Sequence, residues 1–222
     1  MRHRGKEDIK NFMGEAASAY NALGATEKAE VGTMVSMVLG SLFIVMKLLM
    51  GIYTGSVVFI YSCIYAVCVV LCKLLYLKNA DSGRKDKKRV YYTICFVMIL
   101  AAFSFNFLML IKEEISFSPV RYPAWLTTVF GLYWVYLYYL TFKAIKSAKD
   151  ENSPLLILLR MVNLSSLIMN LVLLQQMVLM LLPISVEVVR TINTICGFFC
   201  GGSMFVISIS MVIYGCIKES EV

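Results

Sequence analysis

The segment KLLMGIYTGSVVFIYSCIYAVCVVLCKLL, residues 47–75, decides the fold, because it joins two apolar spans through a short turn that contains glycine. Gly51 and Gly55 permit a sharp reversal of the chain, and Ser56 is a residue type that caps the start of a helix. After Ser56 the residues are predominantly apolar up to Lys73, over a length that can cross a bilayer. Two consecutive membrane helices with a tight connection are therefore predicted here.

The rest of the chain repeats this pattern. Apolar residues make up 59% of its 222 residues, whereas about 45–50% is usual for a soluble domain. Segments long enough to cross the hydrocarbon layer fall at 31–52, 56–77, 90–111, 124–142, 155–182 and 187–217. The predicted fold class is all-α, an integral membrane bundle of six transmembrane helices. The predicted domains are a cytoplasmic tail over 1–30, a six-helix transmembrane domain over 31–217 and a cytoplasmic tail over 218–222.

Apolar residues at helical spacing between positions 9 and 23 leave two interpretations of the first tail, an amphipathic helix at the membrane interface or a frayed segment. The basic residues gather in alternate connections, and the remaining connections hold only Lys112, Arg121 and Arg190. The positive-inside rule then places both termini in the cytoplasm, which agrees with an even number of helices. No signal-peptide core is evident, and the short loops favour a bacterial cytoplasmic membrane.

The net charge of +7 raises the question of nucleic acid. The most basic run, RKDKKR over residues 84–89, is interpreted instead as a topology signal that touches lipid phosphates. The partner expected from the sequence is the lipid bilayer, and no nucleic acid is expected. A homodimer or a partner membrane protein stays open.

The order K-L-x-x-G-x-x-x-G-S over residues 47–56, followed by an apolar run, resembles the first two membrane helices of the cation diffusion facilitator family of divalent-metal/proton antiporters. The resemblance implies two metal ligands on the second helix, an Asp or His and an Asp, at positions that are here Tyr65 and Val69. A further family acid falls at Ser62. On the fifth helix the family pattern H-x-x-x-D with following serines corresponds to RMVNLSS over residues 160–166, which keeps the serines and has no His or carboxylate. The family's C-terminal cytoplasmic domain is not expected, because the chain ends soon after the sixth span.

The positions of the acidic residues argue against metal transport. All fourteen Asp and Glu residues lie outside the six spans or at their edges, and the only histidine is His3. Zinc sites need His, Cys or carboxylate ligands, and proton antiport usually needs a titratable group in the membrane. Metal/proton antiport is therefore not expected, and neither enzymatic activity nor a cofactor is predicted.

The cysteines leave one metal alternative open. The pairs Cys68 with Cys72 and Cys196 with Cys200 each lie on one helix face, so four sulfurs could meet around a soft ion if the two helices faced each other. The simpler interpretation is that cysteine fills space in buried helices.

The fifth span is the most polar of the six. Buried amides are costly in hydrocarbon unless they are hydrogen-bonded, so its polar face should look into the bundle or a wet cavity. Hydrogen bonding between helices is the simpler interpretation, and a solute path is the other. The candidate pore-lining or solute-lining residues are Ser62, Tyr65, Asn106, Asn163, Ser166, Asn170 and Gln175. Lys47, near the outer end of the first span, is expected to extend its ammonium group to the interface. The other interpretation is a functional role for this charge, such as attracting an anion or closing a gate.

Small residues predict close helix packing at two places, along Gly32, Ser36 and Gly40 and at Gly197 with Gly201. Tyr133 and Trp134 in the fourth span either line a cavity or pack between helices.

Three functions remain. The first is a divergent transporter on a cation-diffusion-facilitator-like scaffold without the divalent-metal site. The second is a non-transporting membrane scaffold or regulatory subunit, and the third is the substrate-binding component of a multi-subunit importer. The polar face of the fifth span favours the first, since it exceeds what a plain bundle needs.

Overall fold

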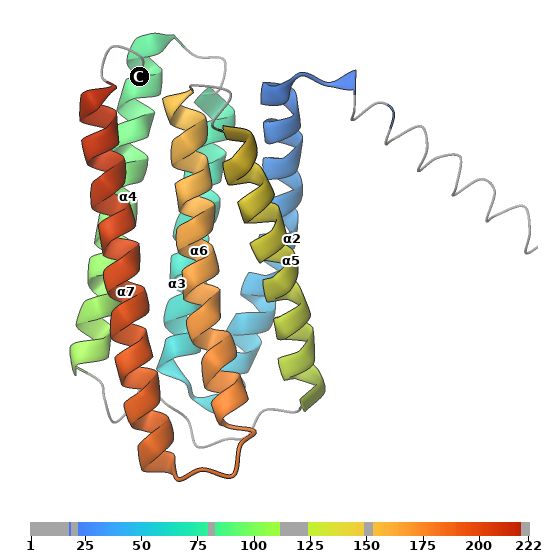
Figure 1. Ribbon diagram of the computed structural model, residues 1–222, viewed down its shortest axis with the longest axis vertical. Helices are drawn as coiled ribbons and strands as arrows, with labels where there is room; N and C mark the ends of the chain where they lie inside the picture. Colours follow the sequence, from blue (N-terminus) through green and yellow to red (C-terminus); the bar gives the residue numbers. More distant parts are fainter. Residues whose placement is uncertain (1–17, 19–21, 80–82, 112–123, 149–152, 219–222) are drawn as a thin grey trace, which may run out of the picture. The chain divides into compact units, whose positions relative to one another are not determined.

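The computed structural model describes residues 18, 22–79, 83–111, 124–148 and 153–218 (Figure 1). The chain forms two compact units, residues 1–36 and 37–222. Most of the predicted tail over 1–30, the predicted tail after residue 218, and the connection that contains Lys112 and Arg121 lie outside the described residues.

The described ranges are helical and contain no strand, which confirms the all-α class. The helices coincide closely with the six apolar segments found in the sequence. Within the second unit each helix runs antiparallel to the one before it (Figure 1). The helices are α2 Ala25–Thr54, α3 Val57–Asn79, α4 Arg84–Ile111, α5 Ala124–Ala148, α6 Pro154–Leu179 and α7 Val186–Ile217.

Five of these helices are long and apolar enough to cross a membrane, and the chain is a multi-pass membrane protein on that basis. The five spans are Glu30–Thr54, Val57–Asn79, Arg84–Leu108, Pro154–Leu179 and Val186–Ile217. The helix that falls short is α5, although it has 25 residues. Its tyrosines, tryptophan and threonines are weakly hydrophobic, so its apolar character comes mainly from aromatic rings. A sixth span at α5 stays a prediction.

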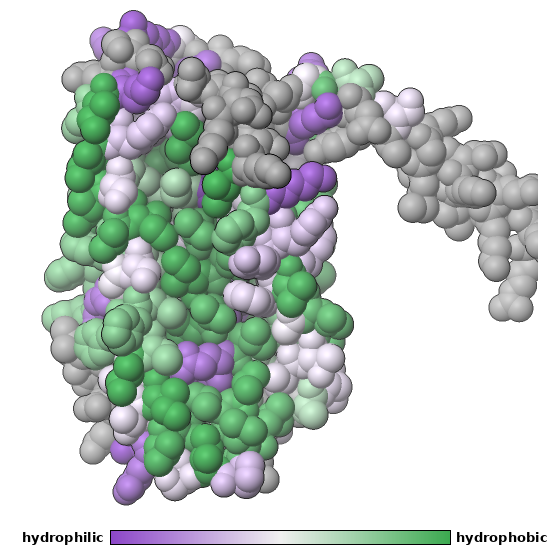
Figure 2. Space-filling model, in the orientation of Figure 1, coloured by the Kyte–Doolittle hydropathy of each residue, from purple (hydrophilic) through white to green (hydrophobic). Residues whose placement is uncertain are grey.

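Large apolar side chains also cover the outside of the helices. Ile52 on α2 is 67% exposed, and Phe199 on α7 is 75% exposed. Figure 2 shows one such face, where hydrophobic residues follow the helices and hydrophilic residues gather mainly near their ends. Exposed apolar surface of this extent would promote aggregation in water. In a membrane, the hydrocarbon chains of the lipids would contact this surface.

The turn between α2 and α3 confirms the sequence prediction, with different roles for its two glycines. Gly55 makes the reversal, because its φ of 65° lies in the left-handed region that favours glycine. Gly51 lies inside α2, where an added Cβ would approach Ile60 Cγ1 of α3 to 2.9 Å. Gly51 therefore permits close approach of the two helices rather than the turn itself.

The contact between α4 and α7 depends on two glycines of α7. A Cβ at Gly201 would collide with the side chain of Asn106, and one at Gly215 would collide with the ring of Tyr91. The Tyr91 hydroxyl donates a hydrogen bond to the Met211 carbonyl at 2.7 Å. The predicted close packing at Gly201 is therefore confirmed.

The other predicted small-residue contact, along Gly32, Ser36 and Gly40, stays a prediction. Among the described residues of the second unit, no atom of another helix lies within 4 Å of a Cβ added at Gly40. The aromatic residues of α5 do pack between helices. The Tyr133 ring stacks on Phe43 of α2 with centroids 3.4 Å apart, and Trp134 Nε1 donates to the Leu167 carbonyl of α6 at 3.4 Å.

Helix α6 is the most buried of the five spans, and it packs against α3, α5 and α7. We call the end of the second unit that contains Gly55, the start of α5, the end of α6 and the start of α7 the turn end. The opposite end, which contains Arg84 and Pro154, is the basic end (Figure 1).

Candidate functional site

Helix α6 carries polar side chains into the bundle at regular intervals. Pro154 starts this helix at a position where a missing N–H is harmless, and an almost unbroken apolar sequence continues it. Four polar side chains of α6 are each at most 7% exposed, namely Arg160, Ser165, Asn170 and Gln176. The last three meet polar groups of α2, of α3 and of the turn between them. We call these three residues, with Lys47, Ser56 and Tyr65, the polar seam.

The centre of the polar seam is a buried lysine. Lys47 of α2 is only 4% exposed, and its Nζ donates to Asn170 Oδ1 at 2.5 Å. The expectation that this ammonium reaches the membrane interface is wrong. The ammonium group finds an acceptor on α6 instead, and a hydrogen bond that involves a charged group contributes about 1.5–3 kcal/mol.

A second pair lies further toward the basic end. The hydroxyl groups of Tyr65 and Ser165 are 2.5 Å apart, and both side chains are at most 1% exposed. Tyr65 stands where the cation diffusion facilitator pattern has a metal ligand. A neutral hydrogen bond between two hydroxyl groups therefore joins α3 to α6 at this position.

The turn end of the seam is less completely bonded. Gln176 Nε2 donates to Ser56 Oγ and Gln175 Nε2 donates to Asn193 Oδ1, both at 3.4 Å, which is long for such bonds. Among the described residues, four buried polar atoms lack a hydrogen-bond partner. They are Gln176 Oε1, Asn193 Nδ2, Thr127 Oγ1 and Thr194 Oγ1.

These four atoms belong to the same end of the second unit. Gln176 precedes the end of α6, Thr127 follows the start of α5, and Asn193 with Thr194 lies in the early turns of α7. Each atom is within about 12 Å of a helix terminus along the helix axis. Buried polar groups in proteins are almost always paired with protein or ordered water. These four atoms are therefore candidate contacts for water or a polar solute.

The structure brings only part of the predicted set together. Tyr65, Asn170 and Gln175 meet polar partners on other helices, as described above. Ser62 is buried but donates to the Phe59 carbonyl of its own helix at 2.9 Å. Asn106 belongs to the contact between α4 and α7, where its Nδ2 donates to the Ala102 carbonyl. Asn163 and Ser166 are half-buried on α6.

Sequence reasoning missed several members of this site. From the sequence, Lys47 is predicted at the interface, and Gln176 is not among the candidate residues although its neighbour Gln175 is. Asn193 was not considered, although it is a strongly polar residue inside the apolar run of α7, and that contrast is a usable signal.

The described residues contain no group of three or more His, Cys, Asp or Glu side chains that could hold a metal ion. The alternative of four converging sulfurs from Cys68, Cys72, Cys196 and Cys200 is therefore wrong. All seven cysteines are free thiols.

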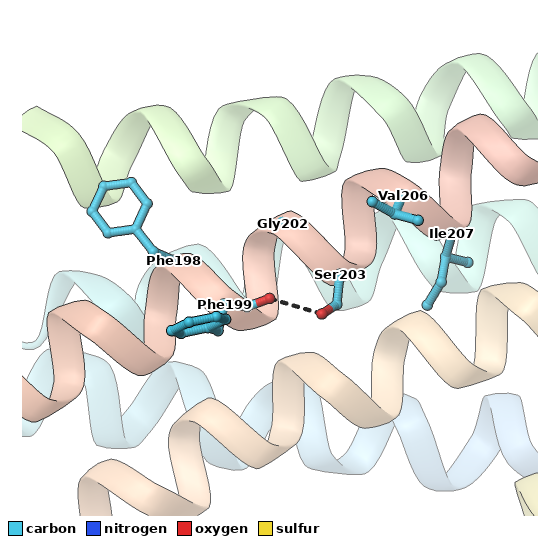
Figure 3. A pocket seen from close by; sticks show the side chains of 6 residues that line it. All are labelled: Phe198, Phe199, Gly202, Ser203, Val206 and Ile207. Atoms are coloured by element: carbon cyan, nitrogen blue, oxygen red, sulfur yellow. Dashed lines mark hydrogen bonds between the residues drawn. The ribbon is translucent and has the colours of Figure 1, made fainter.

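A shallow groove lies apart from the polar seam, on the outer surface of α7. It has a volume of about 600 Å³ and is lined by Phe198, Phe199, Gly202, Ser203, Val206 and Ile207. Its one hydroxyl group, that of Ser203, donates to the Phe199 carbonyl of the same helix at 2.8 Å (Figure 3). The groove therefore offers apolar contacts, which suit a lipid chain better than a polar solute.

No protein-family model, curated protein or solved structure matches this chain. The functional argument therefore rests on the buried polar groups themselves.

Proposed function

We propose that this membrane protein is a transporter that moves a small polar solute along the polar seam of α6. Its scaffold resembles the membrane domain of the cation diffusion facilitators without the divalent-metal site. The observation that carries the proposal is that four buried polar atoms at the turn end have no hydrogen-bond partner among the described residues. An unsatisfied buried donor or acceptor costs about 1–3 kcal/mol, so helix packing alone does not account for these residue types.

The seam gives such a solute a sequence of contacts. It meets Gln176 and Asn193 first, then Lys47 and Asn170, and then Tyr65 with Ser165. Arg160 is buried one and a half turns beyond Ser165, toward the basic end. In this proposal the basic end faces the cytoplasm, as the basic residues at the start of α4 support.

The test is uptake of labelled solutes into proteoliposomes that contain the purified protein. Four probes cover the charge classes: chloride, lactate, rubidium and zwitterionic alanine. We expect at least one probe to enter faster than into empty liposomes. Gln176→Leu should slow that uptake, because it replaces an amide whose oxygen has no partner with an apolar side chain of similar size.

The matched control is Ser208→Ala. Ser208 is fully buried on α7, and its hydroxyl group donates to the Met204 carbonyl of its own helix. Its removal should leave uptake unchanged. Equal uptake by Gln176→Leu and the unmodified protein would contradict the path. No uptake of any probe would leave the non-transporting scaffold or the importer component as the better hypothesis.

A further inference from the structure

The buried charges of the described residues are all of one sign. Lys47, Lys73 and Arg160 are each at most 7% exposed. No Asp or Glu is buried in the part of the chain that the structure describes. The second unit therefore buries basic side chains at three places in its described part.

Lys47 is the most informative of the three. Its ammonium has three N–H donors, and Asn170 Oδ1 accepts one hydrogen bond from it. The nearby Cys63 thiol is turned to the Ile44 carbonyl, with the sulfur 3.6 Å from that oxygen. The surroundings of Lys47 thus supply fewer acceptors than it has donors.

The turn end adds a further unused donor. Asn193 Nδ2 is buried and unpaired, and the residue is only 2% exposed. Gln176 lies six positions beyond Asn170 on α6, about 9 Å along the helix axis. A solute that reaches Lys47 from this end therefore passes amide groups before it meets the charge.

A fixed positive charge in a medium of low polarity discriminates strongly by sign. Two unit charges a few ångströms apart interact several times more strongly in such a medium than in water. Lys47 consequently repels a cation from the centre of the polar seam and attracts an anion, which accepts the hydrogen bonds that its ammonium and the amides can donate.

We propose that the polar seam binds a small monovalent anion, a halide or a monocarboxylate, at the Lys47 ammonium group. The inference rests on the proposed function for its route, but binding at Lys47 can be measured without transport. The two ions share one chemistry, a single negative charge that accepts hydrogen bonds, and separate measurements distinguish them.

The test uses the full chain in two assays, chloride and lactate uptake into proteoliposomes and thermal unfolding in detergent with added chloride or lactate. We expect anion uptake and stabilisation by the same anion. Lys47→Met should reduce the rate of anion uptake, and the affinity for the anion measured by unfolding, by about tenfold or more. Lys47→Arg keeps the charge and should retain most of each, and Ser208→Ala should match the unmodified protein.

A second variant covers the case in which Lys47→Met does not fold. Gln175→Glu keeps the side-chain shape at a half-buried position and adds a negative charge near the turn end. It should lower the ratio of anion uptake to rubidium uptake severalfold at neutral pH, because the added negative charge repels anions and attracts cations. The inference is overturned if anion uptake stays at the level of the unmodified protein in every one of these two variants that folds.

The outcomes separate the two proposals. Uptake of rubidium or alanine without anion uptake or anion stabilisation would overturn the anion site and keep the transporter. Anion stabilisation that requires Lys47, with no uptake of any probe, would overturn the transporter and support the anion site. If chloride enters faster than lactate, the bound class is the halide. If lactate enters faster than chloride, the bound class is the carboxylate.

Discussion

The α4 and α7 contact and the polar seam of α6 are both helix interfaces, yet they treat polar groups differently. Between α4 and α7, Gly201 and Gly215 let the helices approach, and Tyr91 donates to a carbonyl group at 2.7 Å. Along the seam a lysine is buried, and toward the turn end one atom in each of the amides Gln176 and Asn193 lacks a partner. The first interface is what packing requires, and the second contains more polarity than packing requires. Four changes test that difference.

Asn170→Leu should have the largest effect. It removes the acceptor of the Lys47 ammonium and leaves a buried charge without its partner, which should lower the free energy of unfolding by about 3 kcal/mol. Unfolding in detergent, followed by circular dichroism, measures the change. Lys47→Met combined with Asn170→Leu should recover much of the loss, and failure of the double variant to do so would contradict the pairing.

Gly201→Ala should come next. The new methyl group collides with the Asn106 side chain, and overpacking of this kind lowers stability by about 1–3 kcal/mol. Gly202 is the matched control, because no atom lies within 4 Å of a Cβ added there. The two alanine variants should differ clearly in their melting temperatures, and equal values would argue against close packing of α4 on α7.

Tyr65→Phe should have a smaller effect. It removes the hydroxyl group that contacts Ser165 and keeps the ring in place. Hydrogen bonds between membrane helices contribute about 0.6 kcal/mol on average, and a loss of that order is expected in the same unfolding assay. A loss as large as that of Asn170→Leu would mean that the hydroxyl pair, rather than Lys47, holds the seam together.

The smallest effect, and one of opposite sign, is expected for Gln176→Leu. This change removes an unpaired buried oxygen and one long hydrogen bond, so stability should rise by about 1 kcal/mol. In the α4 and α7 contact, where polar groups are paired, Ser208→Ala should not stabilise the protein. A destabilised Gln176→Leu variant would mean that the amide serves packing.

The sequence was sufficient for the helices but only partly for the site. Apolar length and turn chemistry located all six helices, and the Gly55 turn was found from residue type alone. The α5 helix shows a limit, because aromatic residues favour a buried helix without the hydropathy of a membrane span. In the site, Asn170 and Gln175 were found because amides are conspicuous in an apolar helix. The burial of Lys47 could not be predicted, because it depends on which helix brings an acceptor within reach.

The hydrogen bond between Lys47 and Asn170 joins residues 123 positions apart in the chain. Ribosomes add about 5–20 residues per second, so α2 exists for roughly 6–25 s before its partner is made. A lysine at the centre of an inserting helix costs about 2.5–3.5 kcal/mol on insertion scales, and one nearer the end of the span, such as Lys47, costs part of this. The long apolar face of α2, with side chains such as Leu42 and Ile52 exposed on its surface, is what carries this helix into the membrane alone. Biogenesis, as well as the folded state, therefore constrains the composition of the first span.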